Sequence, residues 1–329
     1  MKDAKPPFVI IIVTNFNGLT TYYKGKPIIE VCLKSLRKTD YKNYKVFVAD
    51  GSSADKSVSY IKKKFSEVDI TKDNINIGFT KSCNKAMKYA IKRYKPKYLV
   101  LFNNDLIVTN GNWLRELINI AENRSDVGLV GCKLLYPNGS IQHAGSVIGI
   151  APYNRGRAEK DVGQYDKIED LEAVTGAVLL IKKDVIDRIG YFDENFFIGY
   201  EDMDYCIRSR EAGFKIVYDG NVSLIHLEGS TTTDSKDSSR KELFMFTGQR
   251  NYIYFALKHF TLAGRIKAIL IAIGGSVFSI ESKNRSRRIT NLRFKDRPFL
   301  RLWKTLQAIV AAYSMYNKKG FWWRNYLKK

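Results

Sequence analysis

One carboxylate stands where an apolar, strand-like run of residues ends. Asp105 follows the apolar residues 98–102 and two asparagines, Asn103 and Asn104. If residues 98–102 form a buried central strand, its carboxyl end directs Asp105 into the crevice where α/β sheets bind their ligands. A carboxylate there could bind a divalent metal. The alternative is an aspartate that caps a turn at the strand end.

A second group of acids lies further along the chain. Glu201, Asp202 and Asp204 fall within four positions, and Arg208 follows one helical turn after Asp204. Crowded like charges raise a carboxyl pKa, which suits a general base that takes a hydroxyl proton near neutral pH. The start of a helix would oppose this shift, and an acid-rich helix start without catalytic role is the alternative. The aromatic residues at 191–200 could form a platform for a sugar ring, which favours a site.

A histidine could complete a metal site with the first carboxylate. His226 ends an apolar run and precedes a loop rich in glycine, serine and threonine. Imidazole nitrogen and carboxylate oxygen are both common metal ligands, so His226 and Asp105 form a candidate pair. A lone histidine on an apolar strand is more often a core residue, and the sequence does not show that the two side chains are close.

Alternating apolar and amphipathic segments must position these residues. We expect strands near residues 8–13, 44–50, 68–73, 97–105 and 127–136, with helices near 27–38, 56–65, 80–94 and 113–123. This alternation is typical of a parallel sheet of βαβ units, whose ligands bind beyond the carboxyl ends of the strands. Asn15, Asn17, Asp50 and Asp105 stand at such ends.

The second half of the sequence has a different pattern. We expect a loop-rich stretch at 135–175, then the largely apolar segment 173–183 and a helix near 184–189. A helix directly after residue 200, a strand–turn–strand at 215–231, a polar loop at 231–240, and helices at 242–259, 263–280 and 299–316 follow. The composition changes after the polar loop. We therefore predict a catalytic domain in residues 1–240 and a basic helical region in residues 241–329.

Charge is concentrated in that helical region. The chain has 329 residues and a formal net charge of +22. Residues 241–329 contain 19 Lys and Arg against 3 acids, a net +16, which leaves +6 for the first 240 residues. Such a basic region predicts an anionic partner. No helix-turn-helix, zinc-finger or RNP signature is present, so we do not expect nucleic acid.

Two apolar stretches in the basic region favour a membrane surface. Residues 268–280 and 305–316 are shorter than the roughly 20 residues that span a bilayer, and basic clusters at 283–288 and 317–329 flank them. Apolar helices beside Lys, Arg and Trp are typical of the membrane interface. A helical cap on the catalytic domain, or a homo-oligomer contact, is the alternative.

Four isolated cysteines and the N-terminal residues indicate the compartment. No two cysteines form a C-x-x-C pair, so we expect buried, reduced thiols rather than a zinc or redox site. The apolar run at 8–13 is too short for a secretory signal. We therefore expect a cytoplasmic protein at the inner face of the cell membrane.

Several ordered motifs together resemble one known family. The segments are VTNFNG, VADGSSADKS, NINIGFTKSCNKAMKYA, FNNDL and IHLEGST, together with PNGSIQHAG and the run from Val174 to Phe214. Across about residues 8–260 the chain resembles a family 2 glycosyltransferase of the GT-A fold, in the rhamnosyltransferase-like branch that builds surface glycans. The resemblance implies a Rossmann-like mixed α/β sheet with helices on both faces, followed by the helical appendage.

The resemblance also implies roles for residues. Asp105 and His226 would bind Mg²⁺ or Mn²⁺ on the donor diphosphate, and Asp202, with Glu201 beside it, would deprotonate the acceptor hydroxyl. Asp50 would contact the base of a UDP- or dTDP-sugar, and Asn251 could close over the donor. The implied nucleotide- and donor-binding residues are Thr14, Asn15, Asn17, Asp50, Asn76, Gly78, Lys81, Asn84, Asn103, Asn104, Arg208 and Arg250.

The sequence departs from the family pattern at two positions. Asn103 replaces the first acid of the D-x-D motif, and Ala49 replaces the first acid of the second motif. The expected reaction is inverting, metal-dependent transfer of a sugar to a lipid-linked or polysaccharide acceptor. A sugar nucleotidyltransferase and an anion-binding protein without catalytic activity are the alternatives, but the glycine-rich signature of the former is absent after the first strand.

Overall fold

The computed structural model describes residues 5–227, 238–277 and 298–317. Two compact units divide the chain. Unit 1 consists of Met1–Val147, Asn154–Glu194 and Glu201–Asp234, and unit 2 consists of Ile148–Tyr153, Asn195–Tyr200 and Ser235–Lys329. Two short segments that precede residue 240 are thus grouped with the C-terminal helices. The predicted polar loop and the two basic clusters fall almost entirely outside the described residues.

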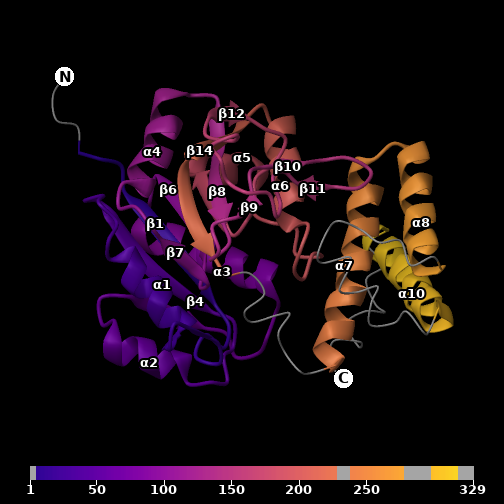
Figure 1. Cartoon of the computed structure of the whole chain (residues 1–329), viewed down its shortest axis with the longest axis horizontal. Coiled ribbons are helices and arrows are strands. Elements are labelled where there is room, and N and C mark those ends of the chain that lie inside the picture. Colours follow the sequence, from indigo (N-terminus) through magenta and orange to yellow (C-terminus); the bar gives the residue numbers. More distant parts are fainter. Residues whose placement is uncertain (1–4, 228–237, 278–297, 318–329) are drawn as a thin grey trace. The chain divides into compact units, whose positions relative to one another are not determined.

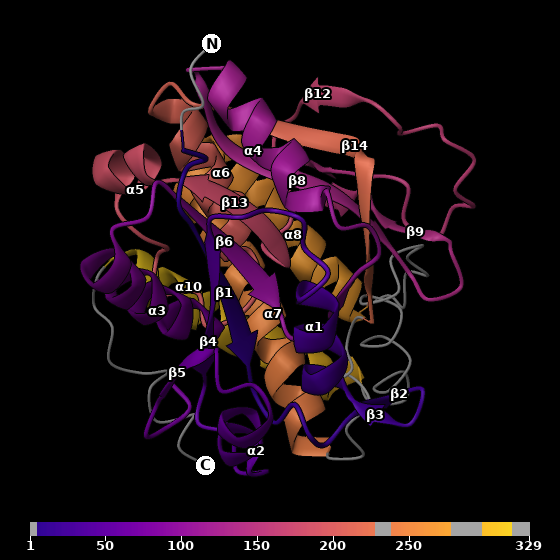
Figure 2. The same cartoon turned by 90° about the vertical axis from the view of Figure 1, so that its left-hand side faces the viewer.

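A large mixed sheet forms the centre of unit 1. Its strand order is β12-β14-β8-β13-β6-β1-β4-β5, with β7 paired to β14 and β9 paired to β8. The strands are β1 (Val9–Asn15), β4 (Tyr44–Asp50), β5 (Asp69–Lys72), β6 (Tyr98–Asn103), β7 (Leu106–Val108), β8 (Val127–Leu135), β9 (Ile141–His143), β12 (Ile168–Asp170), β13 (Val178–Lys182) and β14 (Lys215–His226). Figure 2 shows β6, β1 and β4 as neighbouring strands.

Strand β13 makes the sheet mixed rather than parallel. It runs antiparallel between β6 and β8, whereas β1 is parallel to both β4 and β6. Every β13 residue from Val178 to Ile181 is fully buried, as the continuous apolar run required. The mixed α/β sheet that the family resemblance implied is confirmed.

Amphipathic helices connect and cover these strands. Unit 1 contains α1 (Ile28–Leu36), α2 (Ser57–Lys64), α3 (Phe79–Tyr94), α4 (Trp113–Asn123), α5 (Lys183–Ile189) and α6 (Glu201–Glu211). Helix α3 packs on β1 and β4, and α4 packs on β8 and β14. The apolar side of α4 places Trp113 in the core, where its indole nitrogen donates to Thr39 Oγ1 at 3.0 Å. Figure 1 shows these helices around the sheet.

The last strand of unit 1 differs from its prediction. The expected strand–turn–strand is one strand, β14, which continues through Asp219, Gly220 and Asn221. Its pairing with the parallel strand β8 shifts register between Asp219 and Ser223. A β-bulge therefore takes the place of the turn that the Asp-Gly-Asn sequence predicted. The end of β14 then pairs with β7, so that His226 lies opposite Leu106.

Three long helices make up most of unit 2. They are α7 (Ser238–His259), α8 (Leu262–Val277) and α10 (Pro298–Tyr316), and α10 packs against both others. Thr305 of α10 is fully buried, with its hydroxyl oxygen 2.5 Å from that of Ser276 and 3.1 Å from Gln249 Oε1. Among the described residues, no helix is long and apolar enough to cross a bilayer.

The four cysteines are buried and unpaired, as expected. Burial raises the pKa of Cys32, Cys83, Cys132 and Cys206 well above the usual thiol range. These thiols therefore stay protonated and serve as small core residues.

Candidate functional site

Polar side chains from three strand ends form a buried network. Asn15 ends β1, Asp50 ends β4, and Asn104 follows β6. Asn15 Nδ2 donates to Asp50 Oδ2 at 2.7 Å, and Asn104 Nδ2 donates to Asn15 Oδ1 at 2.8 Å. All three are at least nine-tenths buried. The parallel register, which sets Asn15 opposite Asp50, brings the predicted residues together.

The loop after β4 completes this network through Ser53. Ser53 donates to Asp50 from its backbone nitrogen at 2.8 Å and from its hydroxyl group at 2.7 Å. Its oxygen also accepts from the backbone nitrogen of Asn17 at 2.8 Å. Both Asp50 oxygens are therefore engaged within the protein. A contact between Asp50 and a nucleotide base stays a prediction. The base would have to donate to a carboxylate lone pair that these hydrogen bonds leave unused.

Gly18 is required by the packing of the same network. A Cβ atom at this position would lie 2.4 Å from Asn15 Oδ1, 2.8 Å from Ile29 Cβ and 3.2 Å from Asn104 Nδ2. Asn17 precedes it in a left-handed conformation, with φ of 51°, which asparagine tolerates better than most residues. Close packing beneath the loop that follows β1 therefore explains why glycine stands at position 18, after Asn17.

The predicted metal pair is brought together by the β7–β14 ladder. Asp105 Oδ1 lies 3.1 Å from His226 Nε2, although the residues are 121 positions apart. The backbone nitrogen of Leu227 donates to the Asp105 carbonyl at 3.0 Å, which fixes the turn that carries the carboxylate. Asp105 and His226 are both more than nine-tenths buried. The sequence named both residues but did not show their proximity.

Gln142 of β9 determines which histidine nitrogen carries the proton. Its Nε2 donates to the His226 backbone carbonyl at 3.2 Å, so its Oε1 faces His226 Nδ1, at 2.5 Å. An amide oxygen can only accept, so Nδ1 carries a hydrogen. In a neutral ring, Nε2 then presents a lone pair to the Asp105 carboxylate. Two acceptors 3.1 Å apart need a cation between or beside them, either a proton or a metal.

This donor set fits a divalent cation. It offers one carboxylate oxygen and one imidazole nitrogen as ligands. The second ring nitrogen donates to an amide oxygen, and metal-binding histidines commonly make such a hydrogen bond. No group of three His, Cys, Asp or Glu residues suited to a metal occurs in the described part of the chain. Further ligands would have to come from a bound diphosphate or from water.

The acid group occupies the start of α6. Asp202 Oδ2 accepts from the backbone nitrogen of Gly176 at 2.8 Å, and its Oδ1 accepts from Met203. Burial raises the pKa of Asp202, and these N–H groups partly oppose the shift. Glu201 is buried beside α3, where its charge adds to the burial that raises the pKa of Cys83.

Asp202 lies close to the end of β6. Gly176, which binds its carboxylate, precedes Ala177, and the Ala177 carbonyl accepts from the backbone nitrogen of Asn103 at 2.9 Å. Asn103 in turn accepts from the Thr14 hydroxyl at 3.3 Å. Because β13 runs antiparallel to β6, its start lies at the carboxyl end of β6. The predicted base and the predicted metal ligands therefore share one edge of the sheet.

Arg208 has structural partners instead of a free guanidinium. Its Nε donates to the fully buried Asp204 at 2.8 Å, and its terminal nitrogens donate to the carbonyls of Ile189 at 3.2 Å and Tyr191 at 3.0 Å. The expected phosphate contact would need these bonds to break. In this structure Arg208 positions the loop that precedes α6.

The residues predicted to bind the donor at the start of α3 are of two kinds: some hold the backbone in place, and one is accessible to a ligand. Asn84 Oδ1 accepts from the Phe192 backbone nitrogen at 3.0 Å and its Nδ2 donates to the Phe192 carbonyl at 2.9 Å, so both ends of this buried amide are engaged. Asn76 Oδ1 accepts from the nitrogen of Gly78, whose φ is 86°. Lys81, in the first turn, is half-buried and makes no hydrogen bond or ion pair within the described residues. Lys81 is therefore the one of the four best placed to contact an anionic donor.

Arg250 and Asn251 hold a segment of their own unit. Arg250 donates to Asn251 Oδ1 at 2.7 Å, and Asn251 donates to the carbonyls of Ile198 and Gly199 at 2.9 and 2.8 Å. Burial lowers the pKa of Arg250 to about 10. Both residues thus fix the chain immediately before Glu201, and their predicted role at the donor is not tested by these contacts.

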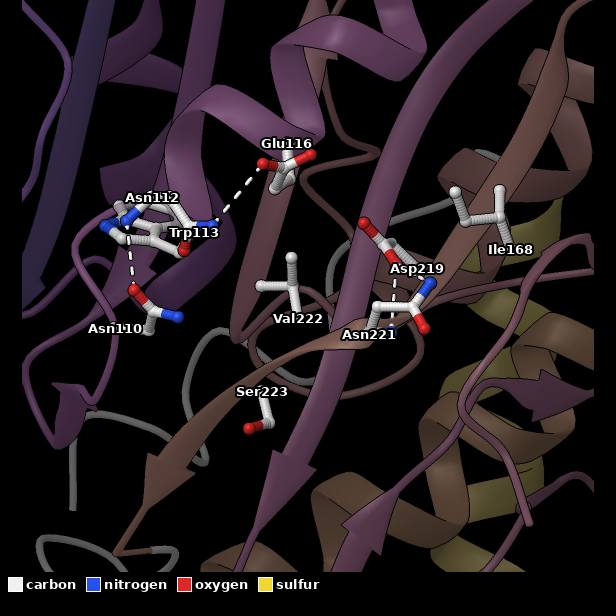
Figure 3. Close-up of a pocket in the computed structure, with 9 residues that line it drawn as sticks. All are labelled: Asn110, Asn112, Trp113, Glu116, Ile168, Asp219, Asn221, Val222 and Ser223. Carbon is white, nitrogen blue, oxygen red and sulfur yellow. Dashed lines mark hydrogen bonds between the residues drawn. The ribbon is translucent and has the colours of Figure 1, made fainter. Parts of the chain in front are cut away.

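A separate polar pocket of about 230 Å³ lies on another part of unit 1. Figure 3 shows its lining, which comes from the start of α4, from the bulge in β14 and from β12: Asn110, Asn112, Trp113, Glu116, Ile168, Asp219, Asn221, Val222 and Ser223. None of the residues predicted to bind donor, metal or acceptor lines it. Two residue pairs of the β7–β14 ladder, Leu224–Val108 and Ile225–Ile107, lie between the pocket and His226. It is therefore not the candidate active site.

Comparison with known sequences gives a consistent result. A model of the family described as glycosyltransferase like family 2 matches residues 6–244. The chain is 33% identical over 151 residues to the O-antigen biosynthesis protein RfbC of Myxococcus xanthus, covering 44% of this chain and 12% of that protein. It is 22% identical over 294 residues to the N-acetylglucosaminyl-diphospho-decaprenol L-rhamnosyltransferase of Mycobacterium tuberculosis, covering 82% of this chain and 94% of that protein.

Coverage of the relatives is uneven. The matches span 12%, 22% and 49% of the lengths of three of the curated relatives. Among solved structures, the chain is similar to the mannosyltransferase PcManGT from Pyrobaculum calidifontis in complex with GDP-Man and Mn²⁺, with a TM-score of 0.56 at 15% identity. That likeness covers 96% of this chain and 87% of the other, and it shows a shared fold.

Proposed function

Because this chain belongs to the glycosyltransferase family 2 whose model it matches, we propose that it moves a sugar from a UDP- or dTDP-sugar onto an acceptor hydroxyl. The acceptor we propose is lipid-linked or a growing polysaccharide of a surface glycan, and the transfer inverts the anomeric centre. The Asp105–His226 pair beside the end of β6, with Asp202 on the same edge, is the observation that carries the proposal.

The proposed cation is Mn²⁺ or Mg²⁺, held by Asp105 and His226. When bound, it would neutralise the charge that develops on the departing nucleoside diphosphate. Gln142 keeps a proton on His226 Nδ1, so Nε2 is available as a ligand. Asn103 supplies an amide where relatives carry an acid, which leaves Asp105 as the anionic ligand of this motif. The Mn²⁺ in the complex of PcManGT supports this choice of metal.

Asp202 is the proposed base. Its carboxylate takes the proton of the acceptor hydroxyl as the oxygen attacks the anomeric carbon, and the bond from that carbon to the diphosphate breaks. Backbone N–H groups of Gly176 and Met203 hold the carboxylate in place, and each oxygen retains a lone pair for the proton. The pKa raised by burial increases its basicity, which favours proton transfer near neutral pH.

Surface-glycan assembly is the proposed setting. The two sequence relatives named above are described as an O-antigen biosynthesis protein and a rhamnosyltransferase acting on a decaprenol-linked sugar. A lipid-linked acceptor is consistent with the basic, apolar composition of residues 241–329. The sequence alternatives, a nucleotidyltransferase or a non-enzymatic binder, receive no support from the family match.

A panel of nucleotide sugars tests the proposal. We would measure release of nucleoside diphosphate from UDP-, dTDP- and GDP-sugars with and without Mn²⁺, for the wild type and for Asp105→Ala, His226→Ala and Asp202→Asn. Loss of the metal-dependent release in the first two variants is expected. Asp202→Asn should keep nucleotide and metal binding but lose transfer to an acceptor.

The control is Asp184→Asn, a change at an exposed aspartate of α5 beyond the end of β13 that is remote from Gly176, and it should leave release unchanged. The proposal would be contradicted if the wild-type protein bound no nucleotide in a metal-dependent way and turned over no donor with any acceptor lipid tested.

A further inference from the structure

Helix α10 has one buried face and, opposite to it, an exposed apolar face. Its inner face packs on α7 and α8 and contains Arg301, Thr305, Ala308, Ala312 and Met315, all nearly or fully buried. An outer stripe is exposed, and it follows the same helical spacing of three and four residues: Phe299, Trp303, Leu306, Val310 and Tyr313. Phe299 is 87% exposed, Val310 60% and Trp303 59%. Figure 1 shows α10 beside α7 and α8.

Helix α8 carries a second exposed apolar stripe. Leu262, Ile266 and Leu270 recur every four residues and are 72%, 53% and 62% exposed. An isolated exposed leucine needs no explanation, but rows of large exposed apolar residues at helical spacing on two helices that pack together mark an interaction surface. We call the exposed stripes of α8 and α10 the apolar face of unit 2.

The charges beside this face have one sign. Helices α8 and α10 contain no acid. Their cations outside the buried core are Arg265, Lys267 and Lys304, whereas Arg301 is 6% exposed and lies on the inner face of α10. Arg265 lies over the ring of Tyr316, 5.4 Å from its centre. Residues 241–329 have a net charge of +16. A partner that covers the face must therefore accept both apolar side chains and an excess of positive charge.

We propose that the apolar face of unit 2 docks on the surface of an anionic phospholipid bilayer. The outer stripe of α10 supplies an apolar phenylalanine together with a tryptophan and a tyrosine, and the amphipathic rings of the last two suit the headgroup level of a bilayer. Lys and Arg beside an apolar stripe attract anionic headgroups. Each side chain of the stripe enters the bilayer while the opposite face of α10 keeps its contacts with α7 and α8.

A second copy of the chain fits this face less well. Two copies that met through α8 and α10 would bring like charges together, and neither helix offers an acid to compensate them. The bilayer supplies the missing negative charge. The inference concerns unit 2 alone and holds whatever donor and acceptor the enzyme uses.

Vesicle flotation with the full chain tests this inference. The probes are vesicles of phosphatidylcholine alone and vesicles that also contain phosphatidylglycerol. We expect binding to the second kind, weakened by added salt, and little binding to the first. Val310→Glu should lower the partition coefficient about tenfold or more, because the stripe loses an apolar anchor and gains a charge repelled by the lipid.

The matched control is Val162→Glu, the same change at a valine of unit 1 that is 71% exposed, and it should leave binding unaltered. Val310→Gln serves as a second variant, and circular dichroism shows whether each variant is folded. Failure of the wild type to bind either vesicle, or equal binding to both, would overturn the inference. So would a lipid-free dimer, seen by analytical ultracentrifugation, that Val310→Glu converts to monomer, since a second copy would then cover the face.

Discussion

Replacing Gln142 with leucine should weaken metal binding without touching a metal ligand. Gln142 is 3% exposed, and its Oε1 accepts from His226 Nδ1 at 2.5 Å. Leucine has a similar size but accepts no hydrogen bond. The His226 ring then either buries an unpaired N–H, at a cost of about 1–3 kcal/mol, or moves its proton to Nε2. In the second case the proton occupies the side that faces Asp105, 3.1 Å away, and a cation must displace it.

The expected magnitude follows from this cost. Loss of a group that orients a metal-binding histidine typically lowers metal affinity about 10–100-fold, which corresponds to about 1.4–2.7 kcal/mol. Calorimetric titration of Mn²⁺ in the presence of UDP measures this affinity directly. The Mn²⁺ concentration that gives half-maximal donor hydrolysis should rise by the same factor, while the rate at saturating Mn²⁺ changes less.

Gln142→Glu provides the matched control. Its carboxylate keeps an acceptor facing His226 Nδ1 but gives up the donor to the His226 carbonyl at 3.2 Å. Metal affinity should therefore stay within about threefold of the wild type, since the orienting acceptor is retained. Equal Mn²⁺ affinity of the wild type and Gln142→Leu would refute the reasoning that the tautomer of His226 prepares the site.

Three further changes test the packing and the buried polar groups. Gly18→Ala should destabilise the fold by about 1–3 kcal/mol, since its Cβ would lie 2.4 Å from Asn15 Oδ1, and urea unfolding measures this. Asn84→Ala should cost about 2–3 kcal/mol by leaving the buried backbone groups of Phe192 unpaired, measured in the same way. Burial, together with the charge of Arg155, lowers the pKa of His143 in the folded protein to about 3. In the unfolded chain this pKa is about 6.5, so the free energy of unfolding should be highest above pH 6.5. It should fall by up to about 1.4 kcal/mol per pH unit as the pH decreases from 6.5 to 3.

Each of these has a comparison that could contradict it. Gly149→Ala, at a glycine with nothing within 4 Å of the added Cβ, should be almost neutral. Exposed Asn74 is the comparison for Asn84, and Asn74→Ala should unfold like the wild type. For His143, urea midpoints at several pH values are compared between the wild type and His143→Gln, and an equal pH dependence in both would contradict the assignment.

Residues at strand ends were the part of the site that sequence could predict. Asn15, Asp50 and Asp105 follow apolar runs, and the carboxyl ends of parallel strands meet at one edge. The prediction reached His226 as well, from its place at the end of an apolar run and from the motif that contains it. That Asp105 and His226 touch depends on the short strand β7, which the sequence analysis did not identify, and on its pairing with β14.

Roles that depend on distant backbone groups could not be predicted. Asn84 and Arg208 look like donor-binding residues in sequence, but carbonyls at 189–192 take up their side chains. Gln142 and Ser53 lie in the quoted segments PNGSIQHAG and VADGSSADKS, but nothing singled them out there, because amide and hydroxyl side chains are common. Asp219-Gly220-Asn221 predicts a turn, yet neighbouring β8 continues alongside and the segment stays in the strand as a bulge.

The separation of the metal pair along the chain links cation binding to folding. Asp105 and His226 lie 121 positions apart, so they meet only after the strand pairing between β7 and β14 has closed a long loop. Such non-local contacts form late, and an incompletely folded chain has no such pair. A cation that binds the native pair alone would stabilise the fold by about 2.7 kcal/mol at one hundred times its dissociation constant. The concentration of Mn²⁺ or Mg²⁺ would then determine the fraction of the enzyme that is folded, in addition to the turnover rate of each folded molecule.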